Sequence, residues 1–197
     1  MDLGANLLFW VAVGYLLGSF PSGYVFGRLF AGRDIRVTGS GNVGGMNAFR
    51  NIGRVAGVLT GLFDAGKGAL AVWLGLRHGA ADWVPLAAAA AAVVGHNWML
   101  FLGFRGGKGL GTTLGALLVL RPVLAAVFLA LIGLGALLVR DTNTGAGLAG
   151  ITLFPAMWWS GGGAPAWTAA GAVIALAIAV KHVRDFRAYR DGRRRLA

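Results

Sequence analysis

The sequence predicts an all-α fold, a polytopic integral membrane helical bundle, and three observations support this prediction. Hydrophobic residues make up 57% of the 197 residues, charged residues only 13%, and the mean hydropathy is +0.70. Too few polar side chains are present to cover a water-soluble globule of this size. The 34 glycines are spread through apolar runs, where small residues let helices approach closely. We therefore expect a single membrane domain over residues 1–197 with about seven transmembrane helices.

Each expected span is an apolar run near the roughly 20 residues that an ideal membrane helix needs. In chain order the runs cover residues 5–27, 55–76, 84–104, 109–120, 122–139, 146–159 and 166–180, and a basic tail follows at 181–197. The runs at 109–120 and 146–159 are short, so we expect these helices to be tilted or partly shielded by protein. A bundle of about six spans is the alternative.

The basic residues predict how this bundle is oriented. Fifteen of the 18 lysines and arginines fall on one side of the predicted membrane. They are Arg28, Arg33, Arg36, Arg50, Arg54, Arg105, Lys108, Arg140, Lys181, Arg184, Arg187, Arg190, Arg193, Arg194 and Arg195. The other side holds only Arg77 and Arg121. By the positive-inside rule the rich side is cytoplasmic, so we expect the N-terminus outside and the C-terminus in the cytoplasm.

Composition also narrows the classes of function. The chain has no cysteine, and His78, His96 and His182 are widely separated, so we expect neither a metal ion nor a cofactor. A net charge of +11 would favour nucleic-acid binding in a soluble chain. In a membrane protein the basic residues are first a topology signal, so no nucleic acid is expected as a partner.

The first polar cluster is the loop at residues 34–50, after the first span. Gly39–Gly44 matches the dinucleotide pattern G-x-G-x-x-G, but a membrane span follows it, which excludes a soluble nucleotide-binding fold. Glycines around Ser40 and Asn42 favour converging backbone N–H groups that bind an anion beside Arg50. A flexible glycine-rich loop with topogenic arginines is the alternative.

The second cluster is the Gly106–Gly109 cradle, Gly106-Gly107-Lys108-Gly109, which is followed by Thr112. Glycines around a lysine at a helix start are typical of phosphate sites, because the helix terminus supplies free N–H donors and the lysine supplies charge. The pattern is not a Walker A motif, since glycine stands at position 109 where serine or threonine would hold magnesium.

Two further polar features lie within or beside spans. Asp64 and Lys67 form an i, i+3 pair of opposite charge, which must face the bundle interior as either a structural ion pair or a functional one. His96 is a candidate ligand or a helix-packing histidine. His182, at the end of the last span, is a better site candidate than the basic tail, which we interpret as an anionic-lipid contact.

Several motifs along the chain occur together in one known family. They are Gly18-Ser19-Phe20-Pro21-Ser22-Gly23, Asp34-Ile35-Arg36, Gly39-Ser40-Gly41-Asn42, Asp64-Ala65-Gly66-Lys67-Gly68, Gly95-His96-Asn97-Trp98, Phe104-Arg105-Gly106-Gly107-Lys108-Gly109 and Lys181-His182. In these motifs and their order the chain resembles the bacterial acyl-phosphate:glycerol-3-phosphate acyltransferases (PlsY family). The resemblance implies a seven-span enzyme of the bacterial cytoplasmic (inner) membrane that makes lysophosphatidic acid at a site facing the cytoplasm.

The resemblance also implies roles for individual residues. We expect acyl phosphate, glycerol 3-phosphate and membrane lipids as partners, and Ser40, Asn47, Lys108 and His182 as catalytic residues. The expected substrate-binding residues are Gly39, Gly41, Asn42, Gly44, Arg50, His96, Gly106, Gly107, Gly109, Thr112 and Asp185. Acyl phosphate carries a good leaving group, so alignment and charge neutralisation suffice and we expect no covalent acyl-enzyme.

The chain departs from the family pattern at three places. Met46 replaces a hydroxyl side chain, and Thr142 or Thr144 is a candidate substitute for the serine of a later loop. Asp185 stands where the family has asparagine, and its carboxylate would repel phosphate unless it is protonated or paired with Arg184 or another cation. A paralogue with an altered acceptor or no activity is therefore one alternative function. A transporter for a small phosphorylated anion is the other.

Overall fold

The computed structural model describes residues 6–193, and within this range the secondary structure is entirely helical. The elements are α1 (Leu7–Gly18), α2 (Ser22–Ala31), η2 (Ile35–Val37), α3 (Gly45–Asn51), α4 (Arg54–His78), α5 (Val84–Asn97), η3 (Leu100–Leu102), α6 (Leu110–Leu120), α7 (Pro122–Val139), α8 (Thr142–Ser160) and α9 (Pro165–Arg190). The predicted all-α fold is confirmed, and each predicted apolar run contains at least one helix.

Five helical segments within the described residues are long and apolar enough to cross a membrane. They are Leu7–Ala31, Arg54–His78, Val84–Leu102, Pro122–Val139 and Pro165–Arg190, with Leu110–Leu120 as a shorter apolar helix. Many large apolar side chains on these segments are exposed, as Leu137 and Leu138 of α7 are at 76% and 75%. Water would penalise such a surface and hydrocarbon would not, so the fold is that of an integral membrane protein with several spans.

The structure differs from the predicted spans at both ends of the chain. The first run is not one helix, because α1 ends at Gly18 and α2 begins at Ser22. Pro21 lies in this break, and proline has no N–H to continue a helix. At the other end, α9 runs on to Arg190, so most of the predicted tail extends the last helix. Residues 194–197 of that tail lie outside the described residues.

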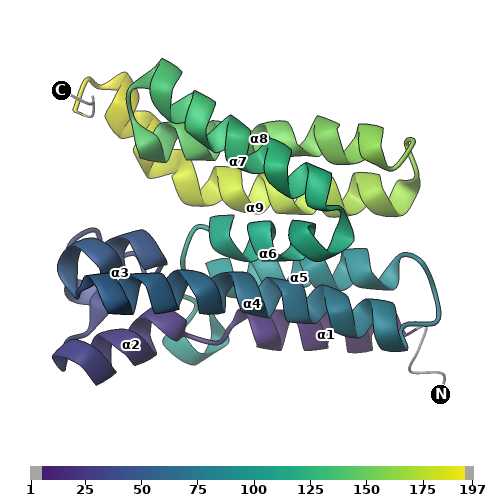
Figure 1. Ribbon diagram of the computed structural model, residues 1–197, viewed down its shortest axis with the longest axis horizontal. Coiled ribbons are helices and arrows are strands. Elements are labelled where there is room, and N and C mark those ends of the chain that lie inside the picture. The colour runs from purple at the N-terminus through teal and green to yellow at the C-terminus, as the bar shows by residue number, and fades with distance from the viewer. Residues whose placement is uncertain (1–5, 194–197) are drawn as a thin grey trace.

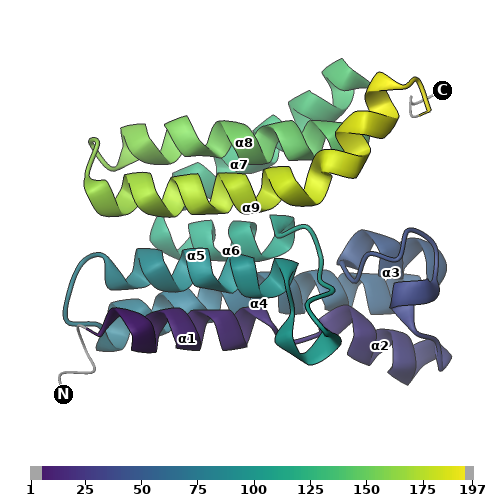
Figure 2. The ribbon, with the colours of Figure 1, turned by 180° about the vertical axis from the view of Figure 1, so that it is seen from behind.

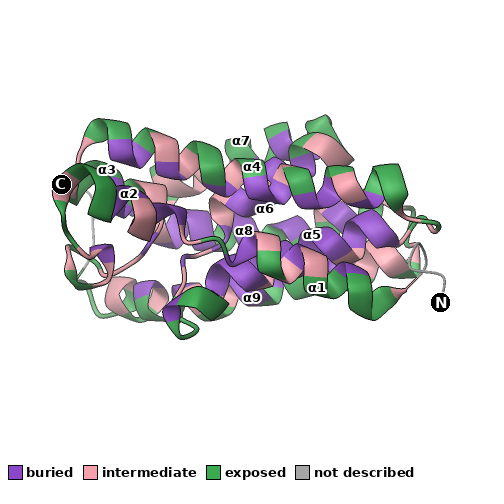
Figure 3. Cartoon of the chain, turned by 90° about the horizontal axis from the view of Figure 1, so that it is seen from below, coloured by how far each residue is buried: buried purple, intermediate pink, exposed green. Residues whose placement is uncertain are grey.

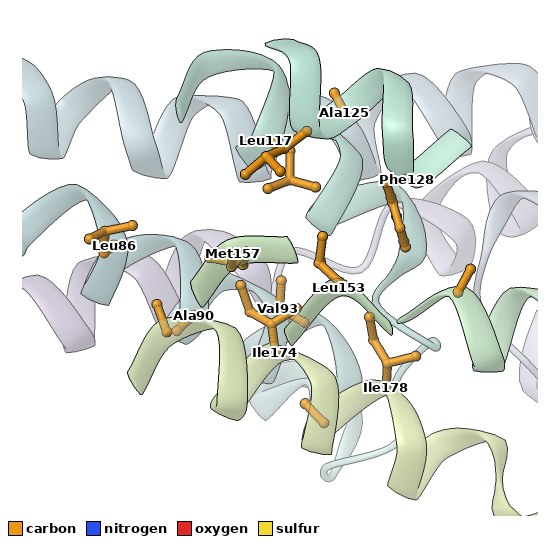
Figure 4. Close-up of a cluster of buried hydrophobic side chains, with 14 residues drawn as sticks. Leu86, Ala90, Val93, Leu117, Ala125, Phe128, Leu153, Met157, Ile174 and Ile178 are labelled. Carbon is orange, nitrogen blue, oxygen red and sulfur yellow. The ribbon is translucent and has the colours of Figure 1, made fainter. Parts of the chain in front are cut away.

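The helices form two layers (Figures 1 and 2). One layer holds α7, α8 and α9, and the other holds α1, α4 and α5, with α6 between them. The largest buried apolar cluster joins α5 to α9 and includes Val93, Phe128, Leu153 and Ile174 (Figure 4). Buried residues line the inner faces of the helices, and exposed residues lie on the outer faces (Figure 3).

One end of the bundle carries the polar elements. The segments α2, η2 and α3, the start of α8 and the C-terminal part of α9 meet there (Figures 1 and 2). The start of α1 and the turns that join α4 to α5 and α8 to α9 lie at the opposite end. Because the helices run lengthwise between these ends, polar loops that are distant in sequence come together at the first one.

Candidate active site

An open cavity of about 800 Å³ lies at the polar end of the bundle. Its lining is drawn from the loop before α3, the Gly106–Gly109 cradle, the start of α8 and the end of α9. It comprises Arg36, Ser40, Gly41, Asn42, Met46, Asn47, Arg50, Asn51, Phe104, Arg105, Gly106, Gly107, Lys108, Asn143, Val180, Lys181, Arg184 and Asp185. Cations far outnumber carboxylates in this set, so the cavity is suited to phosphate groups.

Lys108 is fixed by two acceptors from other elements. Its Nζ donates to Asp185 Oδ2 at 2.7 Å and to Asn143 Oδ1 at 2.9 Å. Asp185 belongs to α9 and Asn143 to the first turn of α8, so one ammonium group joins three segments. This ion pair supplies the cation that the sequence requires beside Asp185, where Arg184 or another cation was expected, and that cation is Lys108.

The first turn of α8 explains why Asn143 contacts this lysine. The carboxylate of Asp141 caps the helix by accepting from the backbone N–H groups of Asn143 at 3.3 Å and Thr144 at 3.2 Å. Thr144, one of the predicted substitutes for a serine, is buried and its hydroxyl donates to Asp141 at 2.5 Å. In the described structure the cavity-lining residue of this turn is Asn143, which the sequence patterns did not indicate.

The loop before α3 is organised by the side chain of Asn47. Its amide nitrogen donates to the carbonyls of Asn42 at 2.7 Å and Thr38 at 2.9 Å, and its oxygen accepts from the N–H of Ser40 at 3.1 Å and from Asn51 at 2.9 Å. This side chain is only 6% exposed. Asn47 therefore holds the loop in shape from its inner side, which places Ser40 and Asn42 on the cavity wall.

The predicted nest of backbone N–H groups is arranged differently from the expectation. The N–H of Ser40 is used by Asn47, that of Gly41 donates to Thr38 O at 3.1 Å, and that of Gly44 donates to Asn42 Oδ1 at 3.2 Å. Gly41 has φ of +72°, a conformation that glycine adopts without strain. These donors stabilise the loop itself, so an anion in the cavity relies on side chains.

Arg36 reaches the cavity from a fixed position. Its Nη2 donates to Asp34 Oδ2 at 2.6 Å, and its guanidinium lies 5.1 Å from the centre of the Tyr24 ring. The hydrogen bond and charge of Arg36 lower the pKa of Asp34 from 3.8 to about 2. A planar guanidinium held on one side by a carboxylate keeps its other donors for a ligand.

The Gly106–Gly109 cradle lies against the C-terminal end of α5. The N–H of Gly107 donates to the carbonyl of His96 at 2.9 Å, and a Cβ placed on Gly107 would lie 2.0 Å from His96 Nε2. Only glycine permits this approach. The structure thus gives the glycines a packing role and leaves Lys108 as the cradle group that carries charge to the cavity.

Several predicted site residues do not line the cavity. They are Gly39, Gly44, His96, Gly109, Thr112 and His182. His182 is fully buried, with Nδ1 2.8 Å from Ile178 O, and Nε2 has no hydrogen-bond partner among the described residues. His96 and Thr112 are buried as well. The cavity lining brings in Lys181, Arg184 and Arg105, which the sequence marked only as topogenic charges or motif neighbours.

The fold and cavity define an integral membrane protein with a phosphate-type site at one end. A family model for glycerol-3-phosphate acyltransferase matches residues 8–192. The glycerol-3-phosphate acyltransferase of Synechococcus sp. strain CC9902 is 41% identical over 179 residues, which cover 89% of this chain and 87% of that protein. Glycerol-3-phosphate acyltransferase 1 of Dehalococcoides mccartyi is 41% identical over 184 residues, covering 89% and 86%.

Solved structures agree with these relatives. The crystal structure of PlsY, an integral membrane glycerol 3-phosphate acyltransferase, in its glycerol 3-phosphate form matches with a TM-score of 0.86 and 32% identity. The match covers 97% of this chain and 96% of that chain. The lysophosphatidic acid form matches with a TM-score of 0.82. This chain belongs to the glycerol-3-phosphate acyltransferase family of the PlsY type.

Proposed function

We propose that this membrane enzyme transfers the acyl group of an acyl phosphate to a hydroxyl of glycerol 3-phosphate, which forms lysophosphatidic acid for phospholipid synthesis. The observation that carries the proposal is the cation-rich cavity around Lys108, within the fold of the acyltransferase family. Donor and acceptor each bring a phosphate, and the arginines and lysines that line the cavity can neutralise both.

The reaction needs little from the protein beyond placement and charge. The acceptor hydroxyl oxygen forms a bond to the acyl carbon, the bond from that carbon to the phosphate oxygen breaks, and the hydroxyl proton leaves with inorganic phosphate. Lys108 and Arg50 are placed to stabilise negative charge on the phosphates, and Ser40 and Asn42 are placed to donate hydrogen bonds. Because both substrates are bound in one cavity with their reacting groups aligned, the transfer becomes effectively unimolecular and therefore faster.

In this proposal Asn47 and His182 act as positioning residues and not as acids or bases, although Asn47 lines the cavity and His182 does not. Asn47 shapes the loop that presents Ser40, through the hydrogen bonds of its amide. His182 lies three residues before Asp185 on α9, and its Nδ1 lies 2.8 Å from Ile178 O, which accepts a hydrogen bond from the Nδ1–H tautomer. Its place in the buried part of α9 sets the position of the helix end that carries Lys181, Arg184 and Asp185.

We further propose seven membrane crossings, with the cavity facing the cytoplasm of a bacterial cell and the N-terminus outside. The cavity and most of the basic loops share the polar end of the bundle, and the positive-inside rule assigns such an end to the cytoplasm. Five of these crossings are the long apolar segments, and the other two are the shorter helix α6 and the helix α8. Helix α8 packs against both α7 and α9. Glycerol 3-phosphate would then enter from the cytoplasm.

The experiment that tests the function uses the purified protein in detergent or lipid with palmitoyl phosphate and glycerol 3-phosphate. Lysophosphatidic acid and inorganic phosphate should appear in equal amounts. Phosphate release without lysophosphatidic acid would show donor hydrolysis and a different acceptor. Movement of glycerol 3-phosphate into liposomes without donor, together with no product, would favour a transporter.

A further inference from the structure

A buried polar network lies between α2, α4 and α5, outside the cavity lining. Asp64 Oδ1 accepts a hydrogen bond from Ser22 Oγ at 2.6 Å and pairs with Lys67 Nζ at 2.9 Å, and His96 Nδ1 lies 3.4 Å from the same oxygen without a hydrogen-bond partner among the described residues. All four side chains are buried, with exposed fractions from 0% to 6%. Charged groups so far from water are costly, and none of them has a part in the proposed transfer.

One side of this network holds the break between α1 and α2. Lys67 Nζ also donates to the carbonyl of Phe20 at 3.0 Å, which lies in the break between α1 and α2 and also accepts from the N–H of Ser22 at 3.1 Å. Ser22 is the first residue of α2, and its hydroxyl donates to Asp64. The pair on α4 thus fixes the place where the first span bends.

The other side of the network supports the segment that carries Lys108. The His96 ring, beside Asp64, packs against Gly107. A Cβ placed on Gly107 would lie 2.0 Å from His96 Nε2. Asp64 Cβ lies 3.2 Å from the place where a Cβ on Gly111 would be, at the start of α6. Asp64 therefore lies against the segment at Gly111, after Lys108, and reaches Gly107, before Lys108, through the His96 ring.

We propose that Asp64 is a positioning residue for Lys108, which acts through the ring of His96 and the start of α6. The Asp64 carboxylate sets the orientation of the His96 ring, and the ring sets the position of the Gly107 backbone. The position of Gly107 in turn determines where the Lys108 ammonium lies between Asp185 and Asn143. The expected effect on the kinetic constants rests on the proposed function. The expected effect on the position of Lys108 does not.

A merely structural ion pair predicts a different behaviour. Replacing both partners of a buried pair by uncharged groups of similar size is often neutral for stability, whereas removing one partner is costly. If Asp64 and Lys67 served packing alone, a variant without both charges would regain both stability and function. If Asp64 positions Lys108 through His96, that variant regains stability and remains defective.

The test compares four variants in the full chain. Asp64→Asn removes one charge, and Asp64→Asn with Lys67→Met removes both. His96→Leu keeps the ion pair and the backbone hydrogen bond from Gly107 to His96 O, and removes the contact of the ring with Gly107. Thr60→Val is the matched control, because Thr60 is a fully buried residue one turn earlier on α4 whose hydroxyl donates only within its own helix, to Ala56 O at 2.7 Å.

Two readouts separate positioning from loss of folded protein. Hydrogen exchange of residues 105–111 reports on the cradle without any substrate. The kinetic constants for glycerol 3-phosphate report on the site, because a smaller folded fraction lowers kcat alone, whereas a displaced Lys108 raises KM. We expect the double variant and His96→Leu to exchange faster in this segment and to lose about 100-fold in kcat/KM, with a raised KM.

Either readout can overturn the inference. Wild-type exchange and wild-type KM in the double variant and in His96→Leu would show that the network serves packing alone. If the wild-type chain forms no lysophosphatidic acid but the variants still loosen residues 105–111, the proposed function fails and the positioning role stands. Unchanged exchange beside an active wild type removes the positioning role and leaves the function.

Discussion

At the scale of single residues, Lys108 is the group on which the proposed site depends. Its ammonium bonds to a side chain from α8 and to another from α9, so it joins the Gly106–Gly109 cradle to these two helices before any substrate binds. One of these acceptors, Asp185, is an anion in a cavity suited to anions. The ammonium has three N–H donors and two are used, so a phosphate that binds the third lies beside the carboxylate of Asp185 and is repelled by it.

Replacing Asp185 by asparagine tests this repulsion. Asp185→Asn keeps an acceptor for Lys108 and removes the negative charge, so we expect KM for glycerol 3-phosphate to fall by about tenfold, the equivalent of one charge-assisted hydrogen bond. Steady-state kinetics with saturating palmitoyl phosphate measure the effect. An unchanged or higher KM would mean that the carboxylate assists binding of the acceptor.

The residue types predicted most of the charged groups in the site, but they did not predict which of these groups form pairs. The sequence indicated that an ionised Asp185 needs a cation, either Arg184 beside it or another one. The partner is Lys108, 77 residues away, because the α9 helix turns Asp185 toward the cradle. Asn143 was missed for the same reason, since nothing local in its sequence shows that the start of α8 faces Lys108.

At the scale of elements, the loop between α2 and α3 depends on Asn47. Its amide bonds to backbone groups on both sides of the loop, with the carbonyls of Thr38 and Asn42 as the shortest acceptors. Sequence reasoning made Asn47 a catalytic donor, and the structure shows its amide engaged within the protein. The distinction is measurable.

Asn47→Ala should destabilise the protein and reduce activity together. Carbonyls that lose their donor in a buried position cost about 2 kcal/mol, so the thermal midpoint in detergent should fall. Met46→Leu, a change at the neighbouring exposed residue, is the control and should leave the midpoint unchanged. Loss of activity at an unchanged midpoint would place the Asn47 amide on the substrate.

The same loop predicts a pH dependence through Asp34. Arg36 lowers the pKa of this carboxyl to about 2, so the pair stabilises the fold above the ordinary value of 3.8 and the benefit is lost as the pH falls toward 2. Asp34→Asn should lower the thermal midpoint at pH 6, and the difference from the wild type should shrink between pH 4 and pH 2.

Asp191 offers a matched control for this experiment. It also pairs with an arginine, at 2.6 Å from Arg193, but on an exposed surface. Exposed pairs contribute little, so Asp191→Asn should leave the midpoint unchanged at every pH. An equal effect of the two substitutions would show that Asp34 has no special part in the loop.

Apolar runs predicted where the helices of this chain lie, since a span must bury its backbone groups whatever its neighbours are. They did not predict the break at Ser19–Pro21, where Lys67 donates to the carbonyl of Phe20. They also did not predict that α9 continues to Arg190, because a helix with basic residues at its end is stable outside hydrocarbon.

At the scale of the whole molecule, the lengthwise packing of the helices collects the chemistry at one end. The cavity is formed by the polar loops of that end, and the apolar cluster of α5 to α9 fills the space between the layers (Figures 1 and 4). Function therefore depends on which side of the membrane this end faces.

The orientation is testable because the chain has no cysteine. Val37, which is 85% exposed near the cavity end, should be labelled as Val37→Cys by an impermeant maleimide only after the cells are opened. Ala80, in the turn between α4 and α5, should be labelled as Ala80→Cys in intact cells. The opposite pattern would place the cavity outside the cytoplasm.

The central claim is that the cavity around Lys108 joins an acyl phosphate to glycerol 3-phosphate. Its most direct test measures lysophosphatidic acid formed from palmitoyl phosphate and glycerol 3-phosphate by the purified protein and by Lys108→Met, with the fold of both samples checked by their thermal midpoints. We predict steady product formation by the unmodified protein and a loss of at least about 100-fold in the variant. Equal product from both proteins would contradict the claim.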